Sequence, residues 1–177
     1  MALPGDGGAR DGMGRGWGAE QMTAQQGKQH QPRLSVREID SPRDLREAIA
    51  IRRTVFIEEQ HLTDVVDRDP YDHGVGAVQV LARLEGESVG VGRLHVSRGE
   101  GQIAWVAVLR PHRGLGIGWE LMDALLGAAG RLGARRVTLS AQTHAIGFYR
   151  LLGFRTVGTV WSMGNIEHIT MVRDLED

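Results

Sequence analysis

A glycine-rich stretch in the second half of the chain has the composition of an anion-binding loop. It reads Arg113, Gly114, Leu115, Gly116, Ile117 and Gly118. An apolar run typical of a strand precedes it, and a long amphipathic run typical of a helix follows it. The first N–H groups of a helix attract anions, glycine lets the backbone approach closely, and arginine adds charge. The stretch therefore predicts a phosphate-binding loop, with a tight strand–helix turn as the alternative.

The spacing of the glycines separates this loop from two other kinds of phosphate-binding loop. A Walker loop ends in Gly-Lys-Ser or Gly-Lys-Thr, whereas Gly118 is followed by Trp119 and Glu120. The dinucleotide-binding fingerprint has the spacing GxGxxG, whereas this chain has GxGxG. Lys28 is the only lysine, so the rest of the chain has no lysine for a P-loop or a Schiff base. These observations argue against nucleotide phosphotransfer.

Composition excludes several other kinds of site and partner. The 177 residues include no cysteine, which excludes a thiolate nucleophile, a disulfide and a cysteine-ligated metal. The seven histidines are scattered without metal-binding spacing, so we expect no metal site. A net charge of −1 argues against nucleic-acid partners, and no apolar stretch reaches the roughly 18 residues of a membrane span. The first residues lack the apolar region of a secretory signal, so we expect a cytoplasmic location.

The chain divides by composition near residue 32. Residues 1–32 hold eight glycines and five glutamines, with few aliphatic side chains. Such a segment buries too little apolar surface to offset the entropy lost on ordering, so we predict a disordered tail. Residues 33–177 are long enough to bury about two-thirds of their unfolded surface, and we predict that they form one domain.

Hydrophobic periodicity in this domain alternates between the strand and helix repeats. Helices are predicted at 42–58, after the glycine loop up to Gly133, and at 144–152. Strands are predicted at 34–39, 77–84, 88–97, 103–109, 136–141, 155–162 and 167–173. The second and third strands form a hairpin, and 103–109 is apolar on both faces, which is typical of a central strand. This order predicts an α/β domain with a mixed sheet.

Four further segments, together with the loop, resemble the GNAT superfamily of acetyltransferases. They are VFIEEQ (55–60), SVGVGRL (88–94), LSAQTHAIGFYRLLGF (139–154) and NIEHITM (165–171). The last resembles the closing motif of the ElaA/YjcF-like branch, and the resemblance covers about 36–173. It implies a GNAT-like fold, with a mixed, mostly antiparallel sheet of six to seven strands flanked by helices. It also implies acetyl-CoA as cosubstrate, from which an amine takes the acetyl group directly, without an acyl-enzyme.

The resemblance also implies roles for individual residues. The N–H groups from Arg113 to Gly118 would hold the pyrophosphate of acetyl-CoA. Backbone groups of Val106 and Val108 would pair with its pantetheine arm, and the Val108 N–H would polarise the thioester carbonyl. Tyr149 matches the general acid that protonates the departing thiolate, and the alternative is that it only packs its helix.

The residue that removes a proton from the amine is left open by the sequence. Glu59 is our first candidate, and water-mediated transfer is an alternative. The other candidates are Asp67, Asp69, His61 and His112. Two positions depart from many relatives: Trp105 stands where a polar residue is common, and Gln79 stands where the branch commonly has histidine. His168 matches the terminal motif as either a structural or a substrate-contacting residue.

The sequence therefore predicts an acetyl-CoA-dependent N-acetyltransferase. Its acceptor is expected to be a small-molecule amine or a protein amine, and an acidic stretch between Glu58 and Asp72 is suited to attract a cationic one. The alternative is a non-catalytic acyl-CoA sensor or partner-docking module. Homodimers are common in the superfamily, so a dimer that pairs the late strands around Trp161 is expected by analogy.

Overall fold

The structure is a computed structural model that describes residues 33–62 and 69–175. The predicted tail at 1–32 and Asp67 lie outside the described residues. Among the helices that are described, none is both long enough and apolar enough to cross a membrane.

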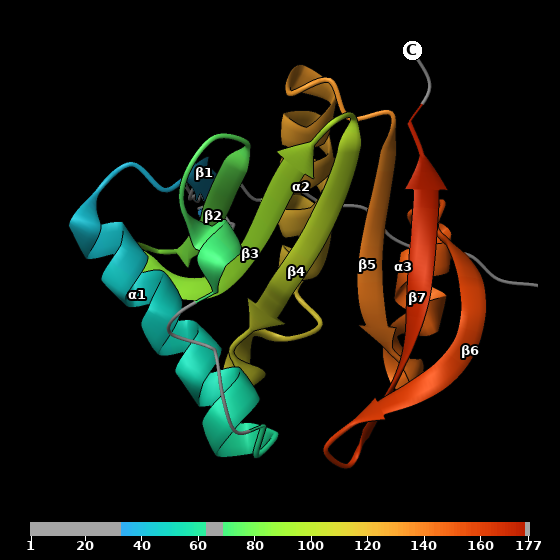
Figure 1. Cartoon of the computed structure of the whole chain (residues 1–177). Helices are drawn as coiled ribbons and strands as arrows, with labels where there is room; N and C mark the ends of the chain where they lie inside the picture. The colour runs from blue at the N-terminus through green and yellow to red at the C-terminus, as the bar shows by residue number, and fades with distance from the viewer. Residues whose placement is uncertain (1–32, 63–68, 176–177) are drawn as a thin grey trace, which may run out of the picture. The chain divides into compact units, whose positions relative to one another are not determined.

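The described strands form one seven-stranded mixed sheet, which confirms the predicted fold class (Figure 1). Its order is β1-β2-β3-β4-β5-β7-β6, with β4 in the centre as predicted. Only β4 and β5 pair in parallel, and the other neighbours are antiparallel. The bounds are β1 Leu34–Glu38, β2 Ala77–Leu84, β3 Glu87–Ser97, β4 Glu100–Val108, β5 Arg136–Gln142, β6 Arg155–Met163 and β7 Ile166–Asp174.

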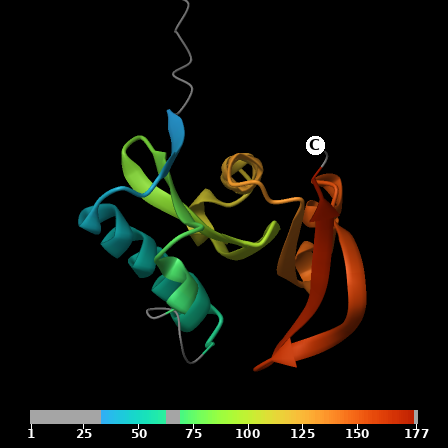
Figure 2. The same cartoon turned by 45° about the horizontal axis from the view of Figure 1, so that its top comes forward.

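Three α-helices cover the two faces of the sheet (Figure 2). They are α1 (Pro42–Arg52), α2 (Ile117–Arg131) and α3 (Ile146–Leu151). One core cluster joins α1 to apolar side chains of β2, β3 and β4, and the other joins α2 and α3 to side chains of the sheet's opposite face. The single-turn or irregular helices are η1 (Arg53–Glu59), η2 (Pro70–Asp72), η3 (Arg110–His112) and η4 (Thr143–Ala145).

The start of the first helix is as the sequence predicts, but its second half is not. The Ser41 hydroxyl accepts a hydrogen bond from the Asp44 N–H at 3.1 Å, and Pro42 occupies the first turn. The α-helix ends at Arg52, and a π-helix takes over from Arg53 to Glu59, so the prediction of one regular helix over 42–58 is wrong. The wider π turn changes the direction in which the residues at its end point.

A gap opens between the two central strands of the sheet. β4 and β5 pair only over Glu100–Ile103 and Arg136–Leu139, although both strands continue beyond these residues. Figure 1 shows the two strands diverging toward their C-terminal ends. β4 also contains a bulge against β3, where Trp105 has φ of +57°, a rare conformation for a bulky residue. The divergence and the bulge together open the middle of the sheet.

Candidate active site

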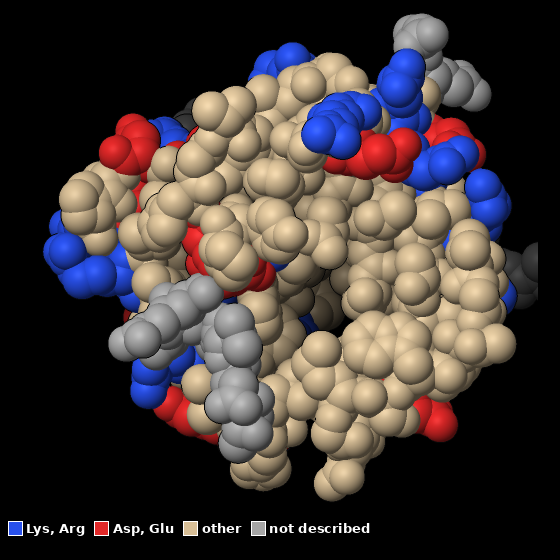
Figure 3. Space-filling model, viewed as in Figure 1, with Lys and Arg blue, Asp and Glu red and all other residues tan. Residues whose placement is uncertain are grey.

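Two cavities meet at the gap between β4 and β5. We call the first the Tyr149 cavity, of about 270 Å³, and the second the Trp161 cavity, of about 490 Å³. Figure 3 shows this face hollowed, with uncharged residues around most of the opening. The lining residues that the two cavities share are Phe56, Ile103, Ala104, Trp105, Leu139, Ser140, Gln142 and His168. A molecule in one cavity therefore lies next to a molecule in the other.

The predicted phosphate loop lies between η3 and α2 and borders a third cavity, of about 430 Å³. Gly114 and Gly116 have φ of +79° and +81°, and apart from the glycine and its two chain neighbours no described residue lies within 4 Å of where a Cβ would stand. No described side chain caps the start of α2, so the N–H groups of Ile117 and Gly118 have no acceptor within the helix. The loop thus presents open glycine backbone and unpaired donors, which suits an anion.

The backbone of Val108 faces the gap. The Leu109 N–H donates to the Val89 carbonyl of β3 at 2.9 Å. Because donors of neighbouring residues in a strand point in opposite directions, the Val108 N–H points away from β3, toward the gap. The same alternation places the N–H of Val106 on this side. Both residues line the Tyr149 cavity, as the predicted pairing with a pantetheine arm requires.

Arg113 and Glu59 form an ion pair at the edge of the Tyr149 cavity. The Arg113 guanidinium donates to the Val108 carbonyl at 2.8 Å and to the Glu59 carboxylate at 2.8 Å. Arg110 lies 3.8 Å from the same carboxylate. Arg113 lines the cavity, whereas Glu59 lines neither the Tyr149 nor the Trp161 cavity. This geometry suits Glu59 to orient Arg113, and its role as the base stays a prediction.

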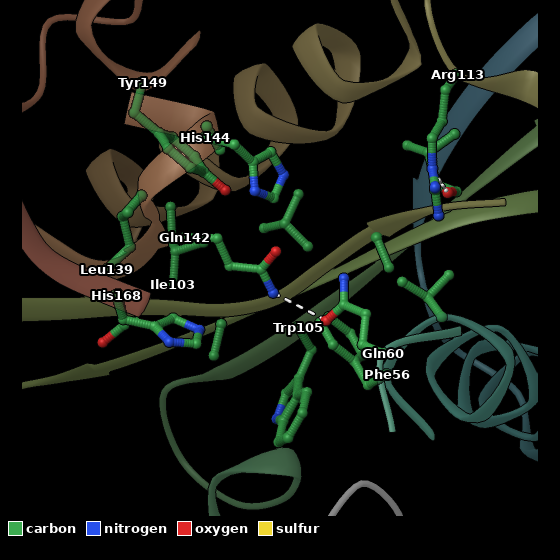
Figure 4. Close-up of a pocket in the computed structure, with 17 residues that line it drawn as sticks. Phe56, Gln60, Ile103, Trp105, Arg113, Leu139, Gln142, His144, Tyr149 and His168 are labelled. Carbon is green, nitrogen blue, oxygen red and sulfur yellow. Dashed lines mark hydrogen bonds between the residues drawn. The ribbon is translucent and has the colours of Figure 1, made fainter. Parts of the chain in front are cut away.

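Tyr149 lies on α3 and lines the cavity named after it (Figure 4). Its ring packs edge-to-face against Phe148 and Phe154, with centroid distances of 5.1 and 6.0 Å. Burial raises the pKa of the Tyr149 hydroxyl to about 12, because the charged phenolate is poorly solvated there. The hydroxyl is therefore a proton donor throughout the neutral range. The side chain packs its helix and borders the cavity, so both roles foreseen for it are compatible with the structure.

Asp69 places a carboxylate beside the bulge of β4. It accepts hydrogen bonds from the Trp105 indole at 2.7 Å and from the Arg93 guanidinium at 2.5 Å, and the Tyr71 N–H donates to its other oxygen at 2.9 Å. Burial alone would raise the pKa of Asp69, but these donors outweigh it and hold the pKa below its usual value. Asp69 lines the Trp161 cavity as an ionised group whose charge is already paired.

Two buried arginines, Arg52 and Arg93, lie beside Asp69 and Trp105, and neither is among the site residues expected from the sequence. Arg52 is fully buried and donates to Asp72 and Gln79, both at 2.7 Å. Its guanidinium also lies 5.6 Å from the centre of the Trp105 ring. Arg93, 2% exposed, pairs with Asp69. The only sequence signal was that Arg52 falls on the apolar face of its predicted helix, where an arginine needs a buried partner.

The other residues that the sequence singled out differ in whether they line the two cavities at the gap. His61 is exposed and lines neither of the two cavities, and His112 borders the cavity at the glycine loop. Gln79, which departs from the branch pattern, is bound in the Arg52 cluster and does not line the gap. His168 and Gln142 line both cavities. The Gln142 amide donates to the Gln60 side chain at 2.8 Å, which joins β5 to the end of η1 across the gap (Figure 4).

Comparisons with known sequences agree with this geometry. Residues 43–154 match the family described as Acetyltransferase (GNAT) family. The uncharacterized N-acetyltransferase YjcF of Bacillus subtilis is 33% identical over 132 residues, which cover 73% of this chain and 92% of that protein. The uncharacterized protein YyaT of the same organism is 30% identical over 143 residues, which cover 80% of this chain and 97% of that protein.

Solved structures show the same fold. Escherichia coli ElaA superposes with a TM-score of 0.71 and 26% identity, over 81% of this chain and all of that one. An acyl-CoA N-acyltransferase from Pseudomonas aeruginosa also gives a TM-score of 0.71, with 28% identity over 81% of this chain and 99% of that one. The resemblance inferred from the sequence motifs is thereby confirmed.

Proposed function

The chain belongs to the GNAT family of acetyltransferases, and from this premise we propose that it moves the acetyl group of acetyl-CoA directly onto a primary amine. Family membership implies an acyl-CoA cosubstrate. The observation that carries the proposal is that the Tyr149 and Trp161 cavities meet at the gap in the sheet and share eight lining residues. Two substrates that enter the two cavities would bring a thioester and an amine together there.

The residues of the Tyr149 cavity and of the glycine-loop cavity, which share Val108 and Arg113, fit an acyl-CoA. The open glycine backbone and unpaired N–H groups at the start of α2 suit a pyrophosphate. The Val106 and Val108 backbone suits the pantetheine arm, which would pair with β4 where β5 has diverged. The Val108 N–H would also donate to the thioester oxygen as charge develops on it. Tyr149 would donate to the departing sulfur.

The Trp161 cavity is our candidate for the acceptor site. Trp161, Met163 and Tyr71 contribute apolar surface to it, and the charges of Asp69 and Arg93 neutralise each other. Three carboxylates of the acidic stretch that was expected to attract a cation, those of Glu59, Asp69 and Asp72, are instead paired with arginines. These features support a primary amine on an apolar body, as a small molecule or a protein side chain.

The homodimer and the cytoplasmic location stay predictions. β6 is an edge strand of the sheet, and an edge strand offers unpaired backbone groups to a second copy. Large apolar side chains are exposed on it at Val157, Val160, Trp161 and Met163.

The proposed reaction can be tested by following free thiol released from acetyl-CoA by the full chain across a panel of primary amines. We expect thiol release that requires both the chain and an amine, together with an acetylated amine product detected by mass. Binding of acetyl-CoA is measured separately by calorimetry. Binding without amine-dependent release would overturn the proposal in favour of the non-catalytic acyl-CoA module.

A further inference from the structure

His168 on β7 is a buried imidazole whose surroundings set its tautomer. The residue is 6% exposed, and its Nδ1 atom lies 2.9 Å from the carbonyl oxygen of Ile166. A carbonyl oxygen only accepts hydrogen bonds, so Nδ1 carries the hydrogen and donates it. In the neutral ring the other nitrogen, Nε2, then has a free lone pair. The ring is therefore ready to accept a proton at one defined atom.

The sheet directs this ring toward the gap. In the strand register His168 lies opposite Gln142 of β5 and Trp161 of β6, so the three side chains share a face of the sheet. The ring stacks on Trp161, with centroids 5.0 Å apart and planes 21° apart. His168 lines both cavities, and Figure 4 shows its ring pointing toward the space that Gln142 and Tyr149 border. Within 33–62 and 69–175, no protein group is hydrogen-bonded to Nε2.

Tyr149 reaches the same gap from the opposite face. Ile169 and Met171 are one and three positions from His168 on β7, so their side chains point to the opposite face of the sheet. They belong to the core that α2 and α3 cover, and Tyr149 packs against that same core. His168 therefore faces away from α3, on the side of the sheet where α1 lies. Two titratable groups thus flank the gap, one on each face of the sheet. The proposed reaction requires such an arrangement, because one group takes a proton and the other donates a hydrogen bond.

We propose that His168 Nε2 accepts the proton that the acceptor's ammonium group must lose before it attacks, directly or through one water. This assignment rests on the proposed function. The ammonium gives one proton to His168, which becomes an imidazolium, and the nitrogen lone pair is freed. The nitrogen then forms a bond to the acetyl carbonyl carbon, the carbon–sulfur bond breaks, and sulfur keeps its electron pair. The second proton of the nitrogen goes to the sulfur, and His168 returns its proton to solvent.

The other titratable groups around the two cavities are less suited to this role. They are Asp69, Tyr71, Arg93, Arg113, His144 and Tyr149. Asp69 already accepts from Trp105 and Arg93, and its lowered pKa makes it a weak base. Tyr149 stays protonated, Arg93 and Arg113 act as hydrogen-bond donors to Asp69 and Glu59, and Tyr71 is an exposed side chain. His144 is exposed and lines the Tyr149 cavity but not the Trp161 cavity.

The test is the variant His168→Asn in the full chain, because the asparagine amide can still donate to the Ile166 carbonyl but cannot take up a proton. We expect kcat/KM for the amine to fall by about 10²- to 10⁴-fold near neutral pH, with acetyl-CoA affinity unchanged. The deficit shrinks as the pH rises toward about 10.4, where an alkyl-ammonium loses its proton unaided. The matched control is His73→Asn, the same change at an exposed histidine outside both cavities.

A second variant keeps the test decisive if His168→Asn folds poorly. In His168→Ala, added imidazole restores amine-dependent turnover if a base is missing, and leaves it unchanged if only packing was lost. If the loss of kcat/KM in His168→Asn is the same at every pH, or if there is no loss, the assignment of His168 is overturned and the proposed function is not. A wild-type chain that releases no thiol with any amine overturns the proposed function itself, and this assignment falls with it.

Discussion

At the scale of single residues, the raised pKa of Tyr149 restricts what its hydroxyl does. An ordinary thiol has a pKa near 8.5, whereas burial raises the pKa of Tyr149 to about 12. Complete proton transfer from this phenol to a thiolate is therefore uphill by about 5 kcal/mol. A hydrogen bond to the sulfur as its charge develops avoids that cost. For the proposed reaction, the raised pKa therefore suits Tyr149 to stabilise the leaving group by a hydrogen bond better than to act as the final source of the proton.

We predict that Tyr149→Phe lowers kcat by about 10²- to 10³-fold, because one donor to developing charge is lost while the ring still packs against Phe148 and Phe154. The Kd for acetyl-CoA changes little, as measured by calorimetry. Since the folded-state pKa is raised, the hydroxyl stays protonated through pH 10, and Tyr149 contributes no basic limb to the wild-type kcat profile below about pH 11. Unchanged turnover in the variant would remove Tyr149 from the reaction.

The sequence singles out candidate residues that stand in contiguous motifs, and it does not single out those that depend on distant partners. The glycine loop and Tyr149 stand in short patterns with their own spacing. Asp69 was one candidate among several, because its partner Trp105 lies 36 positions further along the chain. Arg52 and Asp72 are 20 positions apart, and only the fold brings their charges together. Pairing of this kind leaves no local repeat for sequence analysis to detect.

At the scale of elements, regular repeats were predicted well and irregular ones were missed. The strand Ala77–Leu84 has the predicted bounds, because apolar side chains bounded by turn residues define it. The π-helix Arg53–Glu59 was missed, since fewer than two turns do not separate a period of 3.6 from a wider one. The bulge at Trp105 was also missed, because tryptophan is common in regular strands. These two irregular elements line the gap, so the parts missed belong to the candidate site.

The glycine loop gives a prediction at this scale. Gly116 has φ of +81° at the start of α2, and a side chain there is strained even though space is open. Gly116→Ala is expected to lower the free energy of unfolding by about 1–2 kcal/mol and to weaken acetyl-CoA binding, because the loop donors shift. Denaturant unfolding and calorimetry measure the two effects.

Gly127→Ala on the same helix is the matched control. Gly127 has an ordinary helical backbone, and a Cβ there would meet only the flexible end of Arg131, at 3.6 Å. This substitution is expected to raise the free energy of unfolding by about 0.5–1 kcal/mol and to leave acetyl-CoA binding unchanged. Equal effects of the two substitutions on binding would contradict a specific role of the loop conformation.

At the scale of the described domain, the sheet is nearly divided in two. Strands β1 to β4 and strands β5 to β7 are joined by four residue pairs between β4 and β5, and by the core under α2. The backbone of β4 beyond Ile103 therefore has a neighbour on one side only, which is unusual for the central strand of a sheet. We infer that the molecule keeps this edge open for a ligand, because an acyl-CoA arm laid along it would complete the missing pairing.

This arrangement predicts which backbone amides a ligand protects in the full chain. The Val108 N–H faces the gap and is expected to exchange with solvent quickly without acetyl-CoA and at least about tenfold more slowly with it. The Leu109 N–H, which donates to Val89 of β3, is the internal control and exchanges slowly in both states. Residue-resolved hydrogen exchange measures both amides in one sample. Protection at the start of α2 without any at Val108 would mean that the ligand binds through its phosphates alone and leaves β4 unpaired, which would contradict the placement of the thioester at the gap.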